Sequence, residues 1–389
     1  AQGGYYHSYQ EIGITSSWAS YVQGVAGNGQ STYLDVYDPA GTKLTQGGQW
    51  AYGTPTFGNC CTQALNSRSN INAFYGSLVA DFNPLNIDIS VRHDGGRTQG
   101  TYRGNTVVSN LDVNGDGIIQ PIERRVPAFN ATTRPINYNY GYWSYSAGIN
   151  YLITPDLAAF ARYSRGGRAN VDRLVIGRIL PDGSARPQDI VNRVNQAEAG
   201  LKYRARNFGL FLTAFYARTS EVTGDDRLRP DLTTNRIYEA KGLELESSFR
   251  SGGFSLNATG TLTDAKIKSD VQTPALVGKT PQRQANFVYA VTPRYTYDRF
   301  TVGGNVVGTT KSFSQNVNQL IMPGYTTVNA FVEVKVLPTV SLSVNANNIF
   351  DTIGLTEEED GSIVSGVTSF VRARSINGRT ISATARLSF

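Results

Sequence analysis

The sequence predicts an all-β protein, an antiparallel up-and-down β-barrel that crosses a membrane. Three observations support this prediction. Apolar and polar side chains alternate with a period of two, short turns alternate with long polar loops, and only 17% of the residues are charged while glycine and tyrosine are abundant. Such a composition favours many strands joined by turns over packed helices. A strand crosses a bilayer with only about 9 to 11 residues, of which every second one faces lipid.

The alternation is clearest in the carboxy-terminal third of the chain. Apolar residues stand at every second position in FSLNATGTLT, VSLSVNAN and ISATARLSF, which cover residues 254–263, 340–347 and 381–389. Successive side chains of a strand point to opposite faces of a sheet. One face of each predicted strand therefore suits lipid and the other suits water.

The connections between the predicted strands alternate in length. Tight turns are expected at Asn83-Pro84, Thr154-Pro155-Asp156, Arg204-Ala205-Arg206, Ser251-Gly252-Gly253, Tyr297-Asp298-Arg299 and Leu337-Pro338-Thr339. Long polar loops are expected over residues 95–141, 165–194, 220–236, 267–283, 310–323 and 351–378. This asymmetry is typical of short periplasmic turns and long extracellular loops. Counting back from Phe389 gives about thirteen strands, with residues 3–12 as a candidate fourteenth, in a single barrel domain over residues 1–389.

Aromatic residues gather near one predicted strand end, at Tyr138, Tyr140, Tyr142, Trp143 and Tyr145. Amphipathic rings are common at the membrane interfaces of a barrel, so these side chains are expected there. The alternative is the core of a soluble β-sandwich, which the alternation of turns and loops disfavours.

Composition excludes several classes of protein. The net charge is +6, but no basic run or RNA-binding motif accompanies it, so no nucleic-acid partner is expected. Only two histidines occur, and no nucleophile elbow, phosphate loop, zinc motif or dinucleotide fingerprint is found, so the protein is not expected to be an enzyme.

Adjacent Cys60 and Cys61 could form a strained vicinal disulfide or remain two thiols. The chain starts without a methionine or a signal sequence, which indicates a processed chain or a fragment.

Two segments near the carboxy terminus, VSLSVNANNIFDTIGLTEEE and RSINGRTISATARLSF, resemble the final strands of TonB-dependent outer-membrane receptors. In that family an Asn-Asn-hydrophobic-Phe-Asp sequence precedes the last long loop, a Gly-Arg pair opens the closing strand, and an aromatic residue ends it. The matching residues here are Asn347, Asn348, Ile349, Phe350, Asp351, Gly378, Arg379 and Phe389. Segments that start at Tyr142 and Pro323 also resemble barrel strands of the family, so the resemblance covers most of residues 70–389.

The resemblance implies a location in the outer membrane of a Gram-negative bacterium. It also implies a barrel of about 22 strands, of which this chain would supply about 14 as a partial barrel. A plug domain and a TonB box belong to the family pattern, and neither is visible here. A family member would be a monomer surrounded by lipid. It would bind a scarce small-molecule nutrient, with a ferric siderophore as the leading expectation, and import it with energy from the TonB complex through the missing plug.

Residues 112–123, DVNGDGIIQPIE, match the twelve-residue calcium loop of EF-hands at each specified position. The expected calcium ligands are Asp112, Asn114, Asp116, Ile118 through its carbonyl, Gln120 and Glu123. Gly117 permits the sharp turn, and Ile119 is expected to pack inward. Because the flanking residues lack amphipathic helical spacing, we expect a stand-alone loop in the extracellular connection over 95–141, where a structural calcium ion would add rigidity, and no calmodulin-like switch. The alternative is an acidic, glycine-rich surface turn that binds no ion.

Arginines mark a candidate ligand site at one strand end, and its residues are Arg162, Arg165 and Arg168. Their guanidinium groups could bind an anionic chelate through charge-assisted hydrogen bonds. The alternative is that they pair with nearby carboxylates in the barrel interior. Acidic residues at the loop tips are expected to form solvated surfaces, and these are Asp225, Asp226, Glu357, Glu358, Glu359 and Asp360.

Three functions from different classes fit the sequence. The leading one is active transport by a TonB-dependent receptor. The second is a passive, calcium-stabilised outer-membrane porin, which would conduct ions without an energy-coupling partner. The third is a secreted calcium-dependent β adhesin, which would be soluble without detergent.

Overall fold

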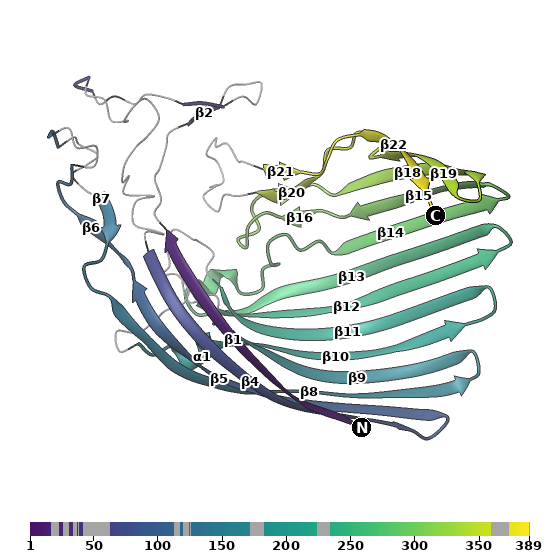
Figure 1. Cartoon of the computed structure of the whole chain (residues 1–389), viewed down its shortest axis with the longest axis horizontal. Helices are drawn as coiled ribbons and strands as arrows, with labels where there is room; N and C mark the ends of the chain where they lie inside the picture. The colour runs from purple at the N-terminus through teal and green to yellow at the C-terminus, as the bar shows by residue number, and fades with distance from the viewer. Residues whose placement is uncertain are drawn as a thin grey trace.

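One antiparallel sheet of fourteen strands forms the molecule, and its strand order follows the sequence (Figure 1). The computed structural model describes residues 1–16, 23–25, 31–33, 37, 39–41, 63–112, 117–119, 124, 126–171, 183–223, 234–358 and 373–388. The strands of the sheet are β1 (Gln2–Ser16), β4 (Gln63–Asp81), β5 (Leu85–Arg103), β8 (Arg134–Thr154), β9 (Leu157–Ala169), β10 (Val191–Arg204), β11 (Phe208–Thr223), β12 (Thr234–Ser251), β13 (Phe254–Asp270), β14 (Phe287–Tyr297), β15 (Phe300–Thr309), β18 (Tyr325–Leu337), β19 (Val340–Asn347) and β22 (Thr380–Leu387). The predicted fold class is confirmed, and β1 is the candidate fourteenth strand.

Shorter elements lie within the long connections. Four of them are two-stranded hairpins, formed by β2 (Gln23–Val25) with β3 (Ser31–Tyr33), β6 (Asn105–Val108) with β7 (Val126–Phe129), β16 (Ser312–Phe313) with β17 (Ile321–Met322), and β20 (Leu355–Glu358) with β21 (Ala373–Ser375). Among the described residues, α1 (Pro187–Ile190) and η3 (Pro274–Leu276) are single helical turns. Within the described part of the chain, no helix is long and apolar enough to cross a membrane.

All six predicted turns connect successive strands of the sheet at the expected residues. The turns gather at one end of the sheet and the long connections gather at the other (Figure 1). Local chemistry explains the agreement, because Pro, Gly, Asp and Asn adopt the backbone angles that a reversal needs. Gly252, for example, has a φ of +53° in the turn from β12 to β13.

The long connections differ in length from the prediction. β5 continues to Arg103 and β8 starts at Arg134, so the connection expected over 95–141 covers residues 104–133. Glycine-rich and polar sequence at the end of β5 indicates a loop by composition, yet β5 stays hydrogen-bonded to β4 and β8 throughout. Sheet pairing needs no lipid, and both faces of a strand can be polar once it leaves the membrane. The polar strand ends therefore extend into water.

The sheet is open among the described residues. Its two edge strands, β1 and β22, each pair with a single neighbour, β4 and β19 respectively. An unpaired edge leaves backbone N–H and C=O groups without partners, which is costly in hydrocarbon.

One face of the sheet is apolar across seven neighbouring strands. A single cross-strand row joins, in register, Ile149, Ala161, Ala199, Ala214, Leu243, Leu262 and Phe287. Ile149 and Leu262 are 50% and 51% exposed. A continuous exposed apolar surface of this kind is suited to lipid and unsuited to water. We therefore call it the outer face.

Aromatic rows border the outer face on both sides. On the turn side, the rings of Tyr203 and Phe208 lie 6.2 Å apart. On the loop side, the rings of Tyr145 and Tyr163 also lie 6.2 Å apart. From Phe208 to Tyr216, β11 rises about 26 Å, or about 20 Å perpendicular to a bilayer at a tilt of about 40°. The two rows thus flank the apolar band in the way that aromatic girdles do in an outer-membrane barrel.

The opposite, inner face carries charged and polar side chains. Asp88, Gly148, Arg162 and Glu198 form one of its cross-strand rows. Arg162 donates to both carboxylate oxygens of Asp88, at 2.7 and 2.8 Å, and to Ser146 Oγ at 2.7 Å. These contacts give the interior a hydrated, ion-paired wall, as in other barrels with a polar lumen.

The predicted aromatic group is divided between the two faces. Tyr138 and Tyr140 are buried on the inner face, and Tyr142 lies beside them opposite Asp94. Trp143 and Tyr145 lie on the outer face and are 59% and 40% exposed. The expectation of a membrane-interface position is therefore wrong for the three even-numbered tyrosines, because successive side chains of a strand alternate.

A hydrophobic cluster fills the loop end of the inner face. Its buried members are Leu65, Ile136, Tyr138, Tyr140, Ala169, Val171 and Val191. The connection from β9 to β10 is tied to β8 by a 2.7 Å hydrogen bond from the Asn137 N–H to the Gly183 carbonyl. Gly183 has a φ of +85°, and an added Cβ would meet the Pro135 carbonyl oxygen at 2.8 Å. This connection consequently covers part of the inner face.

Candidate ligand site

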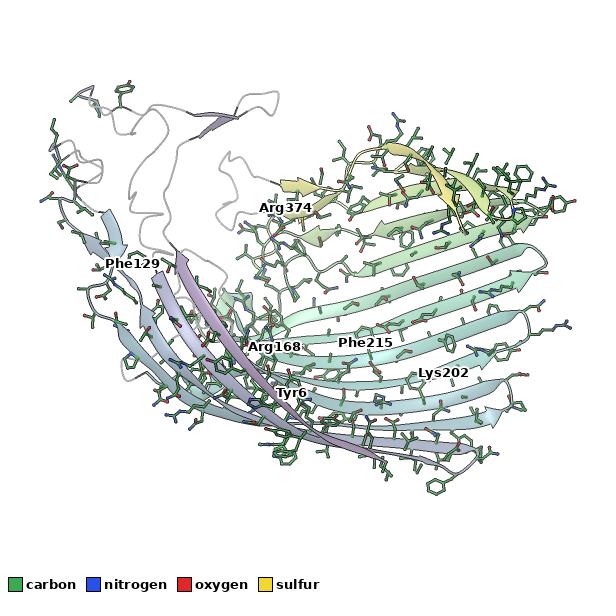
Figure 2. All side chains as sticks on the ribbon, viewed as in Figure 1. Tyr6, Phe129, Arg168, Lys202, Phe215 and Arg374 are labelled. Carbon is green, nitrogen blue, oxygen red and sulfur yellow. The ribbon has the colours of Figure 1, made fainter. Side chains whose placement is uncertain are left out.

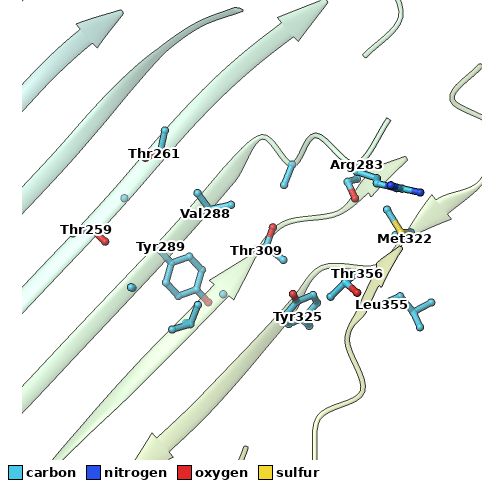
Figure 3. Close-up of a pocket in the computed structure, with 16 residues that line it drawn as sticks. Thr259, Thr261, Arg283, Val288, Tyr289, Thr309, Met322, Tyr325, Leu355 and Thr356 are labelled. Carbon is cyan, nitrogen blue, oxygen red and sulfur yellow. The ribbon is translucent and has the colours of Figure 1, made fainter. Parts of the chain in front are cut away.

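A cavity of about 470 Å³ lies at the loop end of the sheet (Figure 3). Strands β13, β14, β15 and β18 form one wall, and the connections that follow β13, β15 and β19 supply the rest. Strand residues that line it on the inner face include Thr261, Val288, Thr309 and Tyr325, which share one cross-strand row. A cavity of this volume can hold a small molecule.

The connections after β13 and β15 form one unit at the cavity. The N–H groups of Thr280 and Gln282 donate to Asn318 Oδ1 and Asn316 Oδ1, both at 2.9 Å. The N–H of Arg283 donates to the Phe313 carbonyl at 2.6 Å. Because one loop binds three backbone donors of the other, we expect the two loops to keep a fixed mutual position.

A buried ion pair fixes the start of this two-loop unit. The side chains of Arg236 and Asp270 are 1% and 0% exposed, and Arg236 Nε donates to Asp270 Oδ2 at 2.7 Å. Asp270 Oδ1 accepts hydrogen bonds from the N–H groups of Gln272 and Thr273 at 3.0 and 2.9 Å. One carboxylate thus joins β12 to the first turn of the loop.

Two arginines converge on one carboxylate at the cavity. Glu357 Oε1 lies 2.9 Å from an Arg283 nitrogen, and Glu357 Oε2 lies 2.9 Å from an Arg374 nitrogen. Arg374 lies at the loop end of the molecule (Figure 2). Guanidinium groups on opposite sides of a carboxylate form an anion-binding arrangement. In this structure the carboxylate of Glu357 is the anion bound between the two guanidinium groups.

Arg283 connects the anion-binding arrangement with the cavity. Its side chain is among those that line the cavity (Figure 3). Its φ is +62°, a conformation that costs about 1–2 kcal/mol for a residue with a Cβ. Backbone strain of this kind persists where surrounding contacts impose it, and it is frequent at ligand sites. The hydrogen bond from Arg283 N–H to Phe313 supplies such a contact.

The structure does not bring together the three arginines predicted to bind a ligand. Arg162 forms the ion pair with Asp88 on the inner face. Arg165 pairs with Tyr145 in the ladder and therefore lies on the outer face. Arg168 lies near the loop end of β9 and is exposed (Figure 2). An odd spacing along a strand reverses the face, so Arg162 and Arg165 cannot contact one ligand.

Two of the six predicted calcium ligands, Asp112 and Ile118, belong to the described residues. The predicted ligands outside them are Asn114, Asp116, Gln120 and Glu123. Gly117 has a φ of +79° and donates its N–H to Asp112 Oδ2 at 2.8 Å. Ile119 is 37% exposed, so the expectation that it packs inward is wrong. The short strands β6 and β7 flank this segment, where an EF-hand has two helices. Among the described residues there is therefore no helix pair against which Ile119 packs.

The family-like terminal motif forms a hydrogen-bonded joint between β19 and β22. Asn348 Nδ2 donates to the carbonyls of Thr352 and Asn377 at 2.9 and 3.0 Å, and Asn348 Oδ1 accepts from the Thr352 N–H at 2.9 Å. Asp351 Oδ1 accepts from the Arg379 N–H at 2.8 Å. Both ends of the last long connection are therefore held together by two side chains.

Other members of the terminal motif support this joint or lie apart from it. A Cβ on Gly378 would lie 3.2 Å from Asp351 Oδ1, so a small residue suits that position. Asn347 Nδ2 donates to Thr380 Oγ1 at 3.3 Å. Phe350 is 72% exposed, and Phe389 lies outside the described residues, as do Cys60 and Cys61.

The sequence did not single out Arg283 and Arg374, and it placed Glu357 among solvated loop residues. Glu357 is instead paired on both carboxylate oxygens, and its side chain is 28% exposed. No local pattern marks Arg283 as a partner of this carboxylate, because Arg283 comes from the connection after β13, whereas Glu357 and Arg374 face each other across β20 and β21 in the connection after β19.

A comparison with models of protein families shows which family the chain belongs to. The family model described as TonB dependent receptor-like, beta-barrel, matches residues 1–349. The chain belongs to the TonB-dependent receptor family. Members of this family are β-barrel proteins of the Gram-negative outer membrane, which confirms the predicted location. The apolar outer face agrees with that location and contradicts the secreted adhesin alternative.

Solved structures with the same fold are also receptors of this family. The ferric yersiniabactin uptake receptor FyuA from Yersinia pestis is 17% identical, with a TM-score of 0.66 over 84% of this chain and 47% of FyuA. The ferric-catecholate import receptor Fiu from E. coli K12, in its open form, is 14% identical, with a TM-score of 0.61 over 99% of this chain and 48% of Fiu. The ferric citrate transporter FecA is 13% identical, with a TM-score of 0.57 over 84% of this chain and 55% of FecA.

This chain of the TonB-dependent receptor family spans about half the length of these receptors. At such low identity the comparison supports the fold, and the site must be argued from the residues themselves. The arrangement of Arg283, Glu357 and Arg374 beside the cavity is the feature that suits an anionic small molecule.

Proposed function

We propose that the protein imports an anionic metal chelate, with a ferric siderophore as the leading candidate, across the outer membrane. The cavity and the two-arginine arrangement at Glu357 support this proposal more than any other feature. The three structures compared above carry names that refer to ferric chelates, and membership in their family is consistent with the same substrate class. Import would use energy from the TonB complex, through a plug domain, in a monomeric barrel surrounded by lipid.

A displacement step follows from the geometry. An anionic ligand that entered the cavity would compete with Glu357 for Arg283, because both partners need the same guanidinium donors. Release of Glu357 would separate the connection after β19 from the unit formed by the connections after β13 and β15. Ligand binding would thereby change the mutual position of the extracellular loops.

We predict opposite effects for two neutralising substitutions. Arg283→Gln should weaken binding of an anionic iron chelate by roughly 10- to 100-fold, since a charge-assisted hydrogen bond contributes about 1.5–3 kcal/mol. Glu357→Gln should strengthen binding, because the neutral amide competes less well for Arg283. Ferric citrate and a neutral siderophore, titrated by intrinsic fluorescence quenching of the full-length protein, would provide the comparison.

The control for these substitutions is Lys279→Gln, which removes an exposed cation from the same loop. Equal binding of ferric citrate by all three variants would contradict the assignment of the ligand site to Arg283 and Glu357. Uptake of radioactive iron by cells with and without a protonophore tests the transport class itself. Uptake that a protonophore does not reduce, together with steady conductance in planar bilayers, would favour the passive porin.

A structural calcium ion in the connection between β5 and β8 is also part of the proposal. The EF-hand pattern of residues 112–123 and the turn of Gly117 onto Asp112 support it. We expect calorimetry of the full-length protein to show calcium binding, and Asp112→Ala to weaken it at least roughly 10-fold by removing one ligand. No heat at millimolar calcium, or equal binding by the variant, would favour the empty acidic turn.

A further inference from the structure

The inner face of β13, β14, β15 and β18 carries no charge between the cavity and the turn end of these strands. Three successive cross-strand rows cover it, and the first is the row of Thr261, Val288, Thr309 and Tyr325 that lines the cavity (Figure 3). The second row consists of Thr259, Ala290, Val307 and Thr327, and the third row consists of Asn257, Thr292, Asn305 and Asn329. Most of these side chains end in a hydroxyl or an amide. We call the three rows the neutral track.

The neutral track begins within the cavity. Thr259, Ala290 and Val307 of its second row line the cavity together with Thr261 of the first. The third row follows two residues farther toward the turns, or about 7 Å along each strand. A molecule that leaves the cavity along this wall, in the direction of the turns, therefore passes over the amide groups of the third row.

Acidic side chains border the neutral track on β12. The first two rows continue onto that strand through Glu244 and Glu246, which are exposed on the inner face beside Thr261 and Thr259. On their other side, the cross-strand neighbours of the two glutamates are threonine and phenylalanine residues of β11. Neither glutamate forms an ion pair among the described residues. An anion that approached β12 would therefore be repelled by both carboxylates.

A cation ends the neutral track on its turn side. The next row contains Ser255, Arg294, Gly303 and Phe331, so Arg294 carries the first charge below the cavity on these four strands. The Arg294 side chain is exposed. From Val288 in the first row to Arg294, β14 rises about 20 Å. The track thus lies between two cations, with Arg283 at the cavity and Arg294 toward the turns.

An uncharged polar wall suits a ligand that has to move. Hydrogen bonds between uncharged groups are weaker than those that involve a charged group, so each position holds an anion only briefly. Passage requires contacts that are favourable enough for entry and weak enough for release. The side chains of the third row are also held in place, because Asn305 Nδ2 donates to Thr292 Oγ1 at 2.8 Å and Asn329 Oδ1 accepts from the Asn348 N–H at 2.8 Å.

We propose that the neutral track is the path along which an anionic chelate leaves the cavity and crosses the barrel. The chelate moves from Arg283 over the hydroxyl and amide groups to Arg294, while Glu244 and Glu246 keep it away from β12. The path is confined to the part of the wall that β13, β14, β15 and β18 form. This inference rests on the proposed function and adds to it the segment of the wall that the ligand follows.

Isosteric charge substitutions test the path. Asn257→Asp and Asn305→Asp each add one negative charge to the third row without a change in side-chain size. The matched control is Asn150→Asp on the inner face of β8, where Asn150 is half-buried, like Asn305, and lies opposite Phe160. Cells without another ferric citrate transporter express each full-length variant. Binding of radioactive ferric citrate to de-energised cells measures the affinity of the cavity, and uptake by energised cells measures passage. Heat-modifiable migration in gels verifies that each barrel is folded.

We expect each track variant to import ferric citrate roughly 5- to 10-fold more slowly, with an affinity within about 2-fold of the unaltered protein, since like charges in close approach repel each other. Asn150→Asp should bind and import like the unaltered protein. Arg294→Gln should also slow uptake and leave the affinity unchanged, because it removes the cation at the far end of the track.

Uptake by both track variants at the rate of the unaltered protein would overturn the proposal, as would an equal loss of uptake in Asn150→Asp. A loss of affinity as large as the loss of uptake would place the third row within the binding site and would also overturn the proposal. In both cases the unaltered protein still binds and imports ferric citrate, so the proposed function stands. An unaltered protein that neither binds nor imports it would overturn the proposed function and the path together.

Discussion

Asp270→Ala is expected to lower the free energy of unfolding by about 3–5 kcal/mol, the range for removal of one partner from a buried ion pair. The substitution leaves the guanidinium of Arg236 buried, with its side chain 1% exposed and without its carboxylate. It also removes the acceptor for the N–H groups of Gln272 and Thr273. Equilibrium urea unfolding of the protein in lipid vesicles measures the change.

A matched control separates burial from charge. Asp264→Ala removes a carboxylate from the same strand, but its partners Lys241 and Lys266 are exposed, so the expected change is below about 1 kcal/mol. The double variant Arg236→Met/Asp270→Leu should recover the part of the loss that comes from the buried, unpaired guanidinium, because apolar side chains of similar size need no ionic partner. The N–H groups of Gln272 and Thr273 still lack their acceptor in this variant. Similar stability of Asp270→Ala and Asp264→Ala would show that the buried pair does not stabilise the fold.

The same ion pair has a consequence for ligand binding. Asp270 ends β13, and the connection that follows it carries Arg283 to the cavity. A loosened first turn would increase the number of positions available to Arg283, and ordering them again on binding costs conformational entropy. Asp270→Ala should therefore also weaken binding of an anionic chelate, although Asp270 lies outside the cavity lining.

The sheet itself could be predicted from the sequence in considerable detail. Alternation and turn residues are local signals, so the six turns and the strand count follow from short segments such as Leu337-Pro338-Thr339. Strand ends were less predictable, as β5 and β8 show. Polarity indicates where the membrane ends, whereas hydrogen bonding with neighbours decides where the strand ends.

To predict the face on which a side chain lies, the period of two must be applied strictly along the strand. Arg162 and Arg165 are three residues apart, a spacing that unites side chains on a helix and separates them on a strand. The same parity separates Tyr142 from Trp143. Both errors could have been avoided from the sequence alone.

The site at Glu357 could not have been predicted in this way. Arg283 belongs to the connection after β13, whereas Glu357 and Arg374 face each other across β20 and β21 in the connection after β19. Sequence gives no register for the contact between Arg283 and Glu357, because β20 pairs with β21 and not with the connection that carries Arg283. Such contacts become visible only when the loops are placed in space.

The joint at Asn348 gives the second large effect. Asn348→Ala is expected to lower the free energy of unfolding by about 2–4 kcal/mol, for two separate reasons. It removes three side-chain hydrogen bonds from a residue that is 4% exposed, which leaves the Thr352 N–H without its acceptor. It also places alanine at a φ of +47°, a region that Asn adopts more readily than Ala.

Asn348→Gly distinguishes the two reasons, because glycine accepts the positive φ but restores no hydrogen bond. It should be more stable than Asn348→Ala by about 1 kcal/mol and less stable than the unaltered protein. The neighbouring Asn347→Ala removes only the 3.3 Å contact to Thr380 and should change stability by less than about 1 kcal/mol. If Asn347→Ala and Asn348→Ala unfold at the same urea concentration, the hydrogen bonds of Asn348 do not hold β19 and β22 together, and another contact must close the last long connection.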